Sequence, residues 1–84
     1  MGLPQKPIEM NVKQIEELNK KLSNLRHDVN NHLSLIIAAN ELIRYKPEML
    51  ERMTATLTEQ PPNIIKAINK FSAAFEQAFG ITRP

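Results

Sequence analysis

Apolar residues recur at every seventh position through the first half of the chain, and this repeat limits the possible fold more than any other feature. Its six members are Ile8, Ile15, Leu22, Val29, Ile36 and Ile43. Only a helix brings residues with this spacing onto one stripe, because seven residues complete nearly two helical turns. Tyr45-Lys46-Pro47 signals a stop, since the residue before a proline is pushed out of helical geometry. The pattern predicts a first helix from about Glu9 or Asn11 to Arg44.

A second seven-residue repeat predicts a second helix of similar length. Its members are Leu50, Leu57, Ile64, Phe71 and Ala78. Pro47 suits the first turn of a helix and Gly80 suits the position just past its end, so this helix is expected from Pro47 to Phe79. Pro61 and Pro62 lie inside it, and each lacks the amide hydrogen that a helix needs. Because the repeat keeps its phase across the prolines, we expect one kinked helix, with a clean break into two helices as the alternative.

Two matched helices joined by a short turn predict an all-α fold, an antiparallel helical hairpin. Pairing Arg44 with Glu48 across the turn places His27 level with about Ile65. The same register sets the two prolines beside Asn30-Asn31. A two-helix hairpin has no closed core of its own, so two copies are expected to pack as a dimeric four-helix bundle.

Length and composition indicate one small domain. We expect a flexible leader over 1–8, the helical hairpin over 9–80 and a C-terminal tail over 81–84. The net charge is only +2 and the basic residues are spread along the chain, which argues against nucleic-acid binding. Cysteine is absent, which fits a reducing, cytoplasmic location. The longest wholly apolar run, 35–39, is far too short to cross a bilayer, so no direct membrane insertion is expected.

One histidine is expected to face water. His27 falls at the heptad position farthest from the apolar stripe. An exposed neutral imidazole is a competent nucleophile toward phosphorus, and the Asp28 carboxylate, if it curls back, can hold the proton on one ring nitrogen while the other keeps its lone pair. Asn31 lies one turn further on the same face, where its amide can orient a water molecule for dephosphorylation. Nearby cations can help to hold a transferring phosphoryl group: Lys20, Lys21 and Arg26.

The other histidine is expected in the core. His32 falls on the apolar stripe among Val29, Leu33 and Ile36. A polar ring in such a position needs a buried partner such as an amide or a carbonyl. We therefore interpret His32 as structural and assign the chemistry to His27.

The stretch Leu25–Leu33, Leu-Arg-His-Asp-Val-Asn-Asn-His-Leu, resembles the H-box of sensor histidine kinases. The resemblance covers about Leu18 to Phe79, and the string Pro47 to Arg52 is similar to the start of the family's second helix. Asn30-Asn31-His32 replaces the Arg-Thr-Pro ending of the commonest class, so the chain is closer to the His-Asp-x-x-Asn branch. The double proline departs from the family pattern.

The resemblance implies the dimerisation and histidine phosphotransfer domain of a two-component signalling kinase. In that role His27 is the phosphoacceptor, Asp28 orients its imidazole or acts as base, and Asn31 orients water. The implied partners are a second copy of the chain, a response-regulator receiver domain whose aspartate takes the phosphate, and a separate ATP-binding kinase domain. The chain contains no Gly-rich nucleotide lid and no Asp-x-Gly-x-Gly box. No cofactor or metal is therefore expected in the chain itself, and ATP and Mg²⁺ would act only through partner domains.

Two other functional classes remain open. The first is a catalytically silent dimeric helical adaptor that keeps the bundle and has lost the phosphate. The second is a monomeric histidine-containing phosphotransfer domain, which is disfavoured because it needs four helices from one chain.

Overall fold

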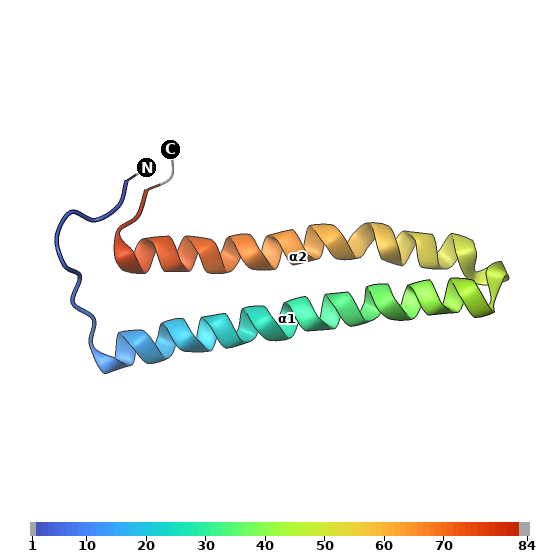
Figure 1. Cartoon of the computed structure of the whole chain (residues 1–84), viewed down its shortest axis with the longest axis horizontal. Helices are drawn as coiled ribbons and strands as arrows, with labels where there is room; N and C mark the ends of the chain where they lie inside the picture. Colours follow the sequence, from blue (N-terminus) through green and yellow to red (C-terminus); the bar gives the residue numbers. More distant parts are fainter. Residues whose placement is uncertain (1, 83–84) are drawn as a thin grey trace.

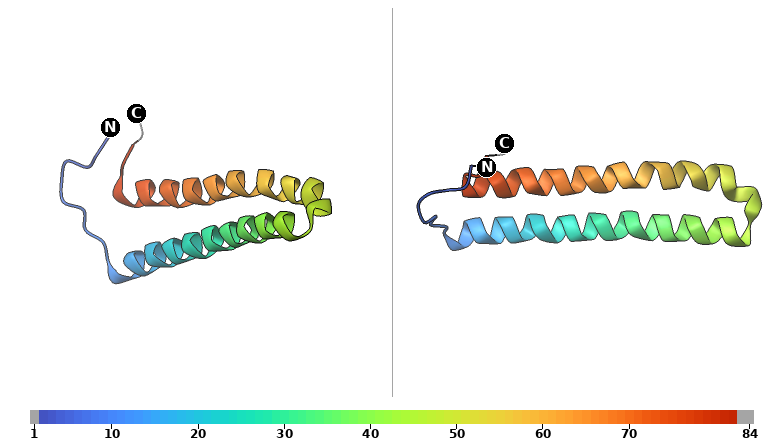
Figure 2. Two further views of the ribbon diagram at one scale, coloured as in Figure 1. Left: turned by 45° about the vertical axis from the view of Figure 1, so that its right-hand side comes forward. Right: turned by 45° about the horizontal axis from the view of Figure 1, so that its top comes forward.

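Two long antiparallel helices dominate the computed structural model, which describes residues 2–82 (Figure 1). Helix α1 spans Val12–Tyr45, a 3₁₀ turn (η1) spans Pro47–Met49, and helix α2 spans Leu50–Phe79. The helices lie closest at the turn and separate toward the chain ends, as Figure 1 and the left view of Figure 2 show. The all-α helical hairpin expected from the sequence is confirmed.

Each outer helix end has a local cause in the sequence. Asn11 caps α1: its side chain accepts a hydrogen bond from the backbone N–H of Gln14 at 2.8 Å, and the Gln14 side chain accepts one from the Asn11 N–H at 2.9 Å. This reciprocal pair satisfies amide groups that a helix leaves open at its start. Gly80 ends α2 in the left-handed conformation, with φ of 64°. Glycine adopts this conformation without the steric cost that a Cβ imposes.

Helix α2 continues through Pro61 and Pro62 without interruption. The prolines cannot donate to the carbonyls one turn earlier, so two rungs of the backbone ladder are missing. In the preceding turns the Thr54 hydroxyl donates to the Leu50 carbonyl at 2.7 Å, and the Thr58 hydroxyl donates to the Thr54 carbonyl at 2.9 Å. Such contacts bend helices slightly. The expectation of one helix through the prolines is confirmed and the alternative of a break into two helices is wrong, whereas the expected kink stays a prediction. The α-helix begins at Leu50 and not at Pro47, because Pro47–Met49 form a 3₁₀ turn.

The helices meet through a seam, by which we mean the buried and half-buried residues that recur every three or four positions on the facing sides of α1 and α2. On α1 these are Leu18, Leu25, Val29, His32, Ile36, Ala39 and Ile43. On α2 they are Met53, Leu57, Gln60, Ile64, Ala67, Phe71 and Ala74. In the middle of the seam His32 Nδ1 lies 2.5 Å from Gln60 Oε1. When Arg44 lies level with Glu48, His32 lies level with Gln60, so this contact shows that the predicted register is present. His27 is therefore level with Ile65, as expected.

The hairpin alone is a thin rod with little interior. Among the described residues only Ala39 and Gln60 are buried, with 1% and 7% of their surfaces exposed. The accessible surface is 6879 Å², against about 5,100 Å² for a compact monomer of this mass. The radius of gyration is 18.1 Å, against about 12 Å for a globular chain of this length. A single copy therefore leaves much apolar surface in water.

The leader and the tail meet at the open end of the hairpin. Gly2 and Thr82 exchange two backbone hydrogen bonds of 3.0 Å, which form an isolated antiparallel bridge. A Cβ on residue 2 would lie 1.7 Å from the Thr82 hydroxyl oxygen, so any larger residue there would require the Thr82 side chain to move. Residue 1 of the expected leader and residues 83–84 of the expected tail lie outside the described residues.

Candidate functional site

His27 lies on the outside of the hairpin, near the middle of α1, and its side chain is exposed. The neighbouring seam residues Leu25 and Val29 are half-buried against α2. Because two residues along a helix correspond to about 200° of rotation, a position between them must face away from α2. The expectation that His27 faces water is therefore confirmed for the single chain.

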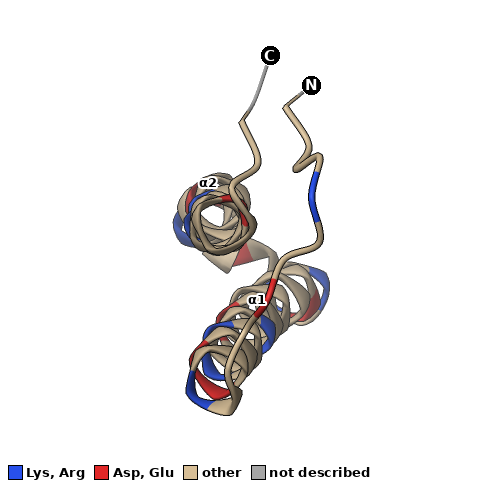
Figure 3. Ribbon diagram, turned by 90° about the vertical axis from the view of Figure 1, so that its left-hand side faces the viewer, with Lys and Arg blue, Asp and Glu red and all other residues tan. Residues whose placement is uncertain are grey.

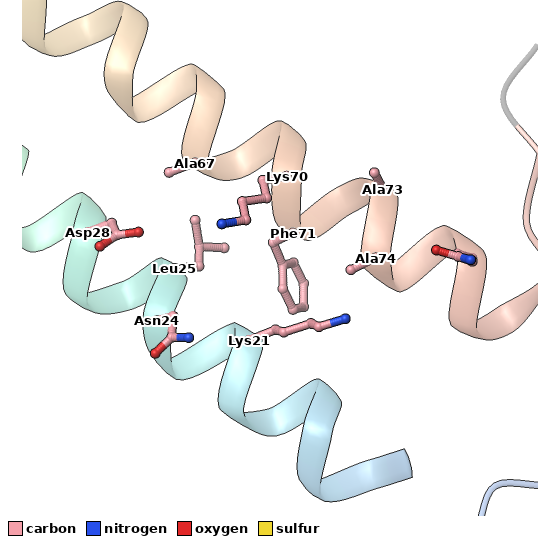
Figure 4. Close-up of a pocket in the computed structure, with 10 residues that line it drawn as sticks. Lys21, Asn24, Leu25, Asp28, Ala67, Lys70, Phe71, Ala73 and Ala74 are labelled. Atoms are coloured by element: carbon pink, nitrogen blue, oxygen red, sulfur yellow. The ribbon is translucent and has the colours of Figure 1, made fainter.

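Asp28 faces α2 instead of the ring of His27. Its carboxylate lines a groove between the helices, on the side where Lys70 reaches across from α2 (Figure 4). The structure forms no hydrogen bond between Asp28 and His27. Successive helical residues project about 100° apart, so the contact would require the Asp28 side chain to rotate back along α1. The role of Asp28 in orienting the imidazole stays a prediction.

Asn31 lies one helical turn beyond His27, and its side chain is exposed. Residues four apart on a helix are neighbours on its surface, so the two side chains share the outer face of α1. No hydrogen bond joins them. His27, Asp28 and Asn31 thus occupy one continuous surface of α1, with Asp28 at its edge toward α2. The three side chains are neighbours on this surface, but no hydrogen bond connects them.

His32 has the buried partner that its heptad position demands. The Oε1 atom of Gln60 can only accept, so the 2.5 Å contact requires His32 to carry a proton on Nδ1. Gln60 is almost fully buried, and no buried side-chain polar atom in the described part of the chain lacks a partner. The interpretation of His32 as a structural histidine paired with an amide is confirmed.

The groove beside Asp28 lies in the open half of the hairpin and has a volume of about 450 Å³. We call it the inter-helix groove. Its apolar floor includes Leu25 and Phe71, and its polar walls include Lys21, Asp28 and Lys70. In Figure 4 the Lys70 ammonium extends along the groove toward Asp28. The two groups do not form an ion pair.

Lys70 is the site residue that sequence reasoning missed. The cations predicted from the sequence all precede the His-Asp pair on the first helix. The signal that identifies Lys70 is the hairpin register, which sets it level with Leu22 on the side of α1 that carries Lys21 and Asp28. Of the three cations named from the sequence, Lys21 lines the inter-helix groove. Lys20 and Arg26 are exposed outside it.

The opposite side of α2 carries no charge over most of its length. We call this surface the uncharged face: Thr54, Thr58, Pro61, Ile65, Ile68, Ser72, Phe75 and Phe79. Ile65, Ile68 and Phe75 expose 57%, 45% and 39% of their surfaces to solvent. The lysine and arginine residues of α2 gather toward the other side of the helix, as the end-on view shows (Figure 3).

The uncharged face continues onto the adjoining side of α1. Leu33 and Ile37 are 44% and 60% exposed there. Aromatic contacts pass along α2 from the seam to this face, with ring centroids 6.1 Å apart for Phe71 and Phe75 and 4.6 Å apart for Phe75 and Phe79. Apolar surface of this extent is typical of a contact with another chain.

Residues 2–82 contain no group of three or more His, Cys, Asp or Glu side chains placed to hold a metal ion. In the same range neither helix combines the length and the apolar character needed to cross a membrane. Comparison of the chain with known protein families, with curated proteins and with solved structures finds no match. Function is therefore inferred from the residues of this chain and their placement.

Proposed function

We propose that this chain is the histidine phosphoacceptor and dimerisation domain of a two-component signalling kinase, which relays phosphate through His27 to the aspartate of a response-regulator receiver domain. The observation that carries the proposal is the position of His27. Its imidazole is exposed in the middle of a long helix of an antiparallel hairpin, beside a carboxylate and an amide. The H-box resemblance of Leu25–Leu33 supports the same reading.

The proposed chemistry needs only an accessible ring nitrogen on this chain. A lone pair of the His27 ring attacks phosphorus, and the N–P bond forms as the bond from phosphorus to the leaving oxygen breaks. That oxygen belongs to ADP when a separate kinase domain presents ATP, or to the receiver aspartate when phosphate flows backward. In forward transfer the aspartate oxygen attacks phosphorus, the N–P bond breaks, and the receiver supplies the Mg²⁺.

Asp28 and Asn31 take supporting roles in this proposal. A carboxylate that accepts the proton of one ring nitrogen keeps the lone pair on the other, which favours attack on phosphorus. An exposed amide one turn away can hold a water molecule in line with a phosphoryl group on a docked receiver. Both side chains lie on the surface of α1 that a docked partner would cover together with His27.

Dimerisation is supported by the surface that one hairpin leaves in water. The seam uses one apolar stripe of each helix, and the uncharged face provides a second stripe along α2. Two copies that meet through this face would form the four-helix bundle, related by a two-fold axis. His27 lies on neither the seam nor this face, so its ring would stay open to solvent in such a dimer.

Transfer from a phosphorylated receiver tests the proposal. A panel of receiver domains, radiolabelled with acetyl phosphate, is incubated with the wild-type chain and with His27→Gln. We expect acid-labile, base-stable label on the wild type and none on His27→Gln. Lys20→Gln is the matched control, because Lys20 lies one heptad earlier at the same outer position, and it should accept label as the wild type does. Equal labelling of the wild type and His27→Gln would refute the assignment.

The competing function is a silent dimeric adaptor. One observation favours it, since the Asp28 carboxylate lines the groove on the side of Lys70 and forms no hydrogen bond with His27. An adaptor would form the same dimer and would accept no label from any receiver in the panel. The same experiment, read together with the molar mass in solution, therefore separates the two functions.

A further inference from the structure

Asp28 stands between two possible partners on different helices. Asp28 is the residue directly after His27, so a rotation about its side-chain bonds brings the carboxylate near the His27 ring. In the structure the carboxylate faces the inter-helix groove instead, on the side of Lys70 (Figure 4). The phosphotransfer role predicted for Asp28 uses only the orientation toward His27. The orientation toward the groove has no part in that role.

Lys70 and Asp28 line the same groove from opposite helices. Lys70 lies level with Leu22, six residues before Asp28, which corresponds to about 9 Å along the helix axis. The lysine stem extends along the groove in the direction of Asp28 (Figure 4). Lys21, the other cation of the groove, is on the same helix as Asp28, one heptad earlier. Lys66 lies nearer to Asp28 in this register but does not line the groove, so Lys70 is the groove cation of the facing helix.

We propose that Lys70 is a positioning residue that competes with the His27 imidazole for the Asp28 carboxylate. When Asp28 turns to Lys70, the His27 ring loses its proton acceptor. When it turns to His27, the ring is held in the tautomer whose other nitrogen keeps the lone pair. The pair lies in a groove open to water, where an ion pair is weak, so either orientation remains accessible.

Because Lys70 lies on α2 and Asp28 lies on α1, the proposed competition depends on how the two helices pack. The distance between Lys70 and Asp28 depends on how far apart α1 and α2 lie at the open half of the rod. A partner or neighbouring segment that draws the helices together would favour the Lys70–Asp28 pair, and one that separates them would release Asp28 to His27. The inference rests on the proposed function only for its effect on phosphate transfer.

Nitrogen NMR of the two histidine rings tests the proposal directly, at a pH where both rings are neutral. In Lys70→Met the ratio of the two His27 tautomers should shift by about two- to five-fold toward the form with the proton on the nitrogen nearer Asp28. His32 is an internal control, because Gln60 fixes its tautomer. Lys70→Arg should behave as the wild type, since it keeps the charge.

Two further variants show whether Lys70 acts through Asp28. In an Asp28→Asn background, Lys70→Met should leave the His27 tautomer ratio unchanged. Arg52→Met, which removes a cation on the same side of α2 but five turns away from Lys70, near the turn of the hairpin, should also leave it unchanged. No shift in Lys70→Met, or an equal shift in the Asp28→Asn background, would overturn the proposal. Circular dichroism checks that each variant keeps the helical content of the wild type.

The rate at which His27 accepts label from a phosphorylated receiver separates this inference from the proposed function. We expect Lys70→Met to accept label faster than the wild type, in proportion to the tautomer shift. A tautomer shift without label on any variant would contradict the phosphoacceptor function and leave the positioning of Asp28 intact. Label on the wild type with no tautomer shift in Lys70→Met would contradict the positioning role alone.

Discussion

His32 and Gln60 join the two helices at the middle of the seam, with Nδ1 and Oε1 2.5 Å apart. The contact is a polar layer between apolar ones, and it fixes the register of the hairpin. Sliding one helix by a heptad would set His32 opposite Met53 or Ala67 and leave both polar groups buried without partners. A buried polar group without a partner costs about 1–3 kcal/mol, so the pair excludes these slipped arrangements.

The first prediction concerns this pair. His32→Leu removes the donor and leaves Gln60 unsatisfied, so we expect the free energy of unfolding to fall by about 1–3 kcal/mol. His32→Leu combined with Gln60→Leu replaces both polar groups with apolar ones and should recover the loss. Urea unfolding of the wild type, the two single variants and the double variant measures the coupling. Additive losses in the double variant would contradict the paired role.

The second prediction concerns the prolines of α2. Pro62→Ala restores an amide that can donate to the Thr58 carbonyl, and it removes the clash of the ring with the preceding turn. We expect an increase in the free energy of unfolding of up to about 3 kcal/mol, measured by urea or thermal unfolding. Pro7→Ala is the control, because Pro7 lies outside the helices, and it should change little. A destabilised Pro62→Ala variant would mean that the proline ring contributes packing that alanine lacks.

The helical hairpin could be predicted from the sequence because its determinants are periodic. The seven-residue repeats gave both helices, and their unbroken phase across Pro61 and Pro62 gave the continuity of α2. Pro47 sets the turn, so a single pairing, Arg44 with Glu48, was enough to place His27 level with Ile65. The start of α1 was predicted at about Glu9 or Asn11 and lies at Val12, because Asn11 and Gln14 form a cap through side-chain hydrogen bonds that periodicity does not show.

The details of the site could not be predicted in the same way. Periodicity places His27 outside and His32 inside, and both placements are confirmed. It does not determine side-chain rotation, so the orientation of Asp28 toward the groove was not foreseen. Lys70 was missed because its relation to Asp28 exists only after the two helices are paired. Gln60 was missed for the same reason, although an amide partner for His32 was expected.

The third prediction concerns the dimer. Ile68→Lys places a charge in the middle of the uncharged face, where each copy would otherwise bury an isoleucine worth about 1.5–3 kcal/mol. A two-fold interface carries the change twice, so the dissociation constant should rise by at least about a hundred-fold. Light scattering over a range of concentrations measures the molar mass. Asn69→Lys adds the same charge at the neighbouring outer position and should leave the dimer intact. A monomeric wild type, or a dimer unaffected by Ile68→Lys, would refute this interface.

The last prediction separates the roles of His27 and Asn31. Asn31→Ala removes an exposed amide that forms no hydrogen bond within the described residues, so stability and the acceptance of label by His27 should both remain as in the wild type. Loss of phosphate from the receiver to water should slow by about a hundred-fold, because a water molecule is no longer held in line with phosphorus. Release of inorganic phosphate from a labelled receiver, in the presence of each variant, provides the measurement. Asn30→Ala is the matched control, since its amide is adjacent in the sequence but projects about 100° away from that of Asn31. Equal phosphate release with the wild type and with Asn31→Ala would show that the amide has no part in dephosphorylation. A loss of label on His27 that accompanies slower phosphate release would instead assign Asn31 to receiver docking.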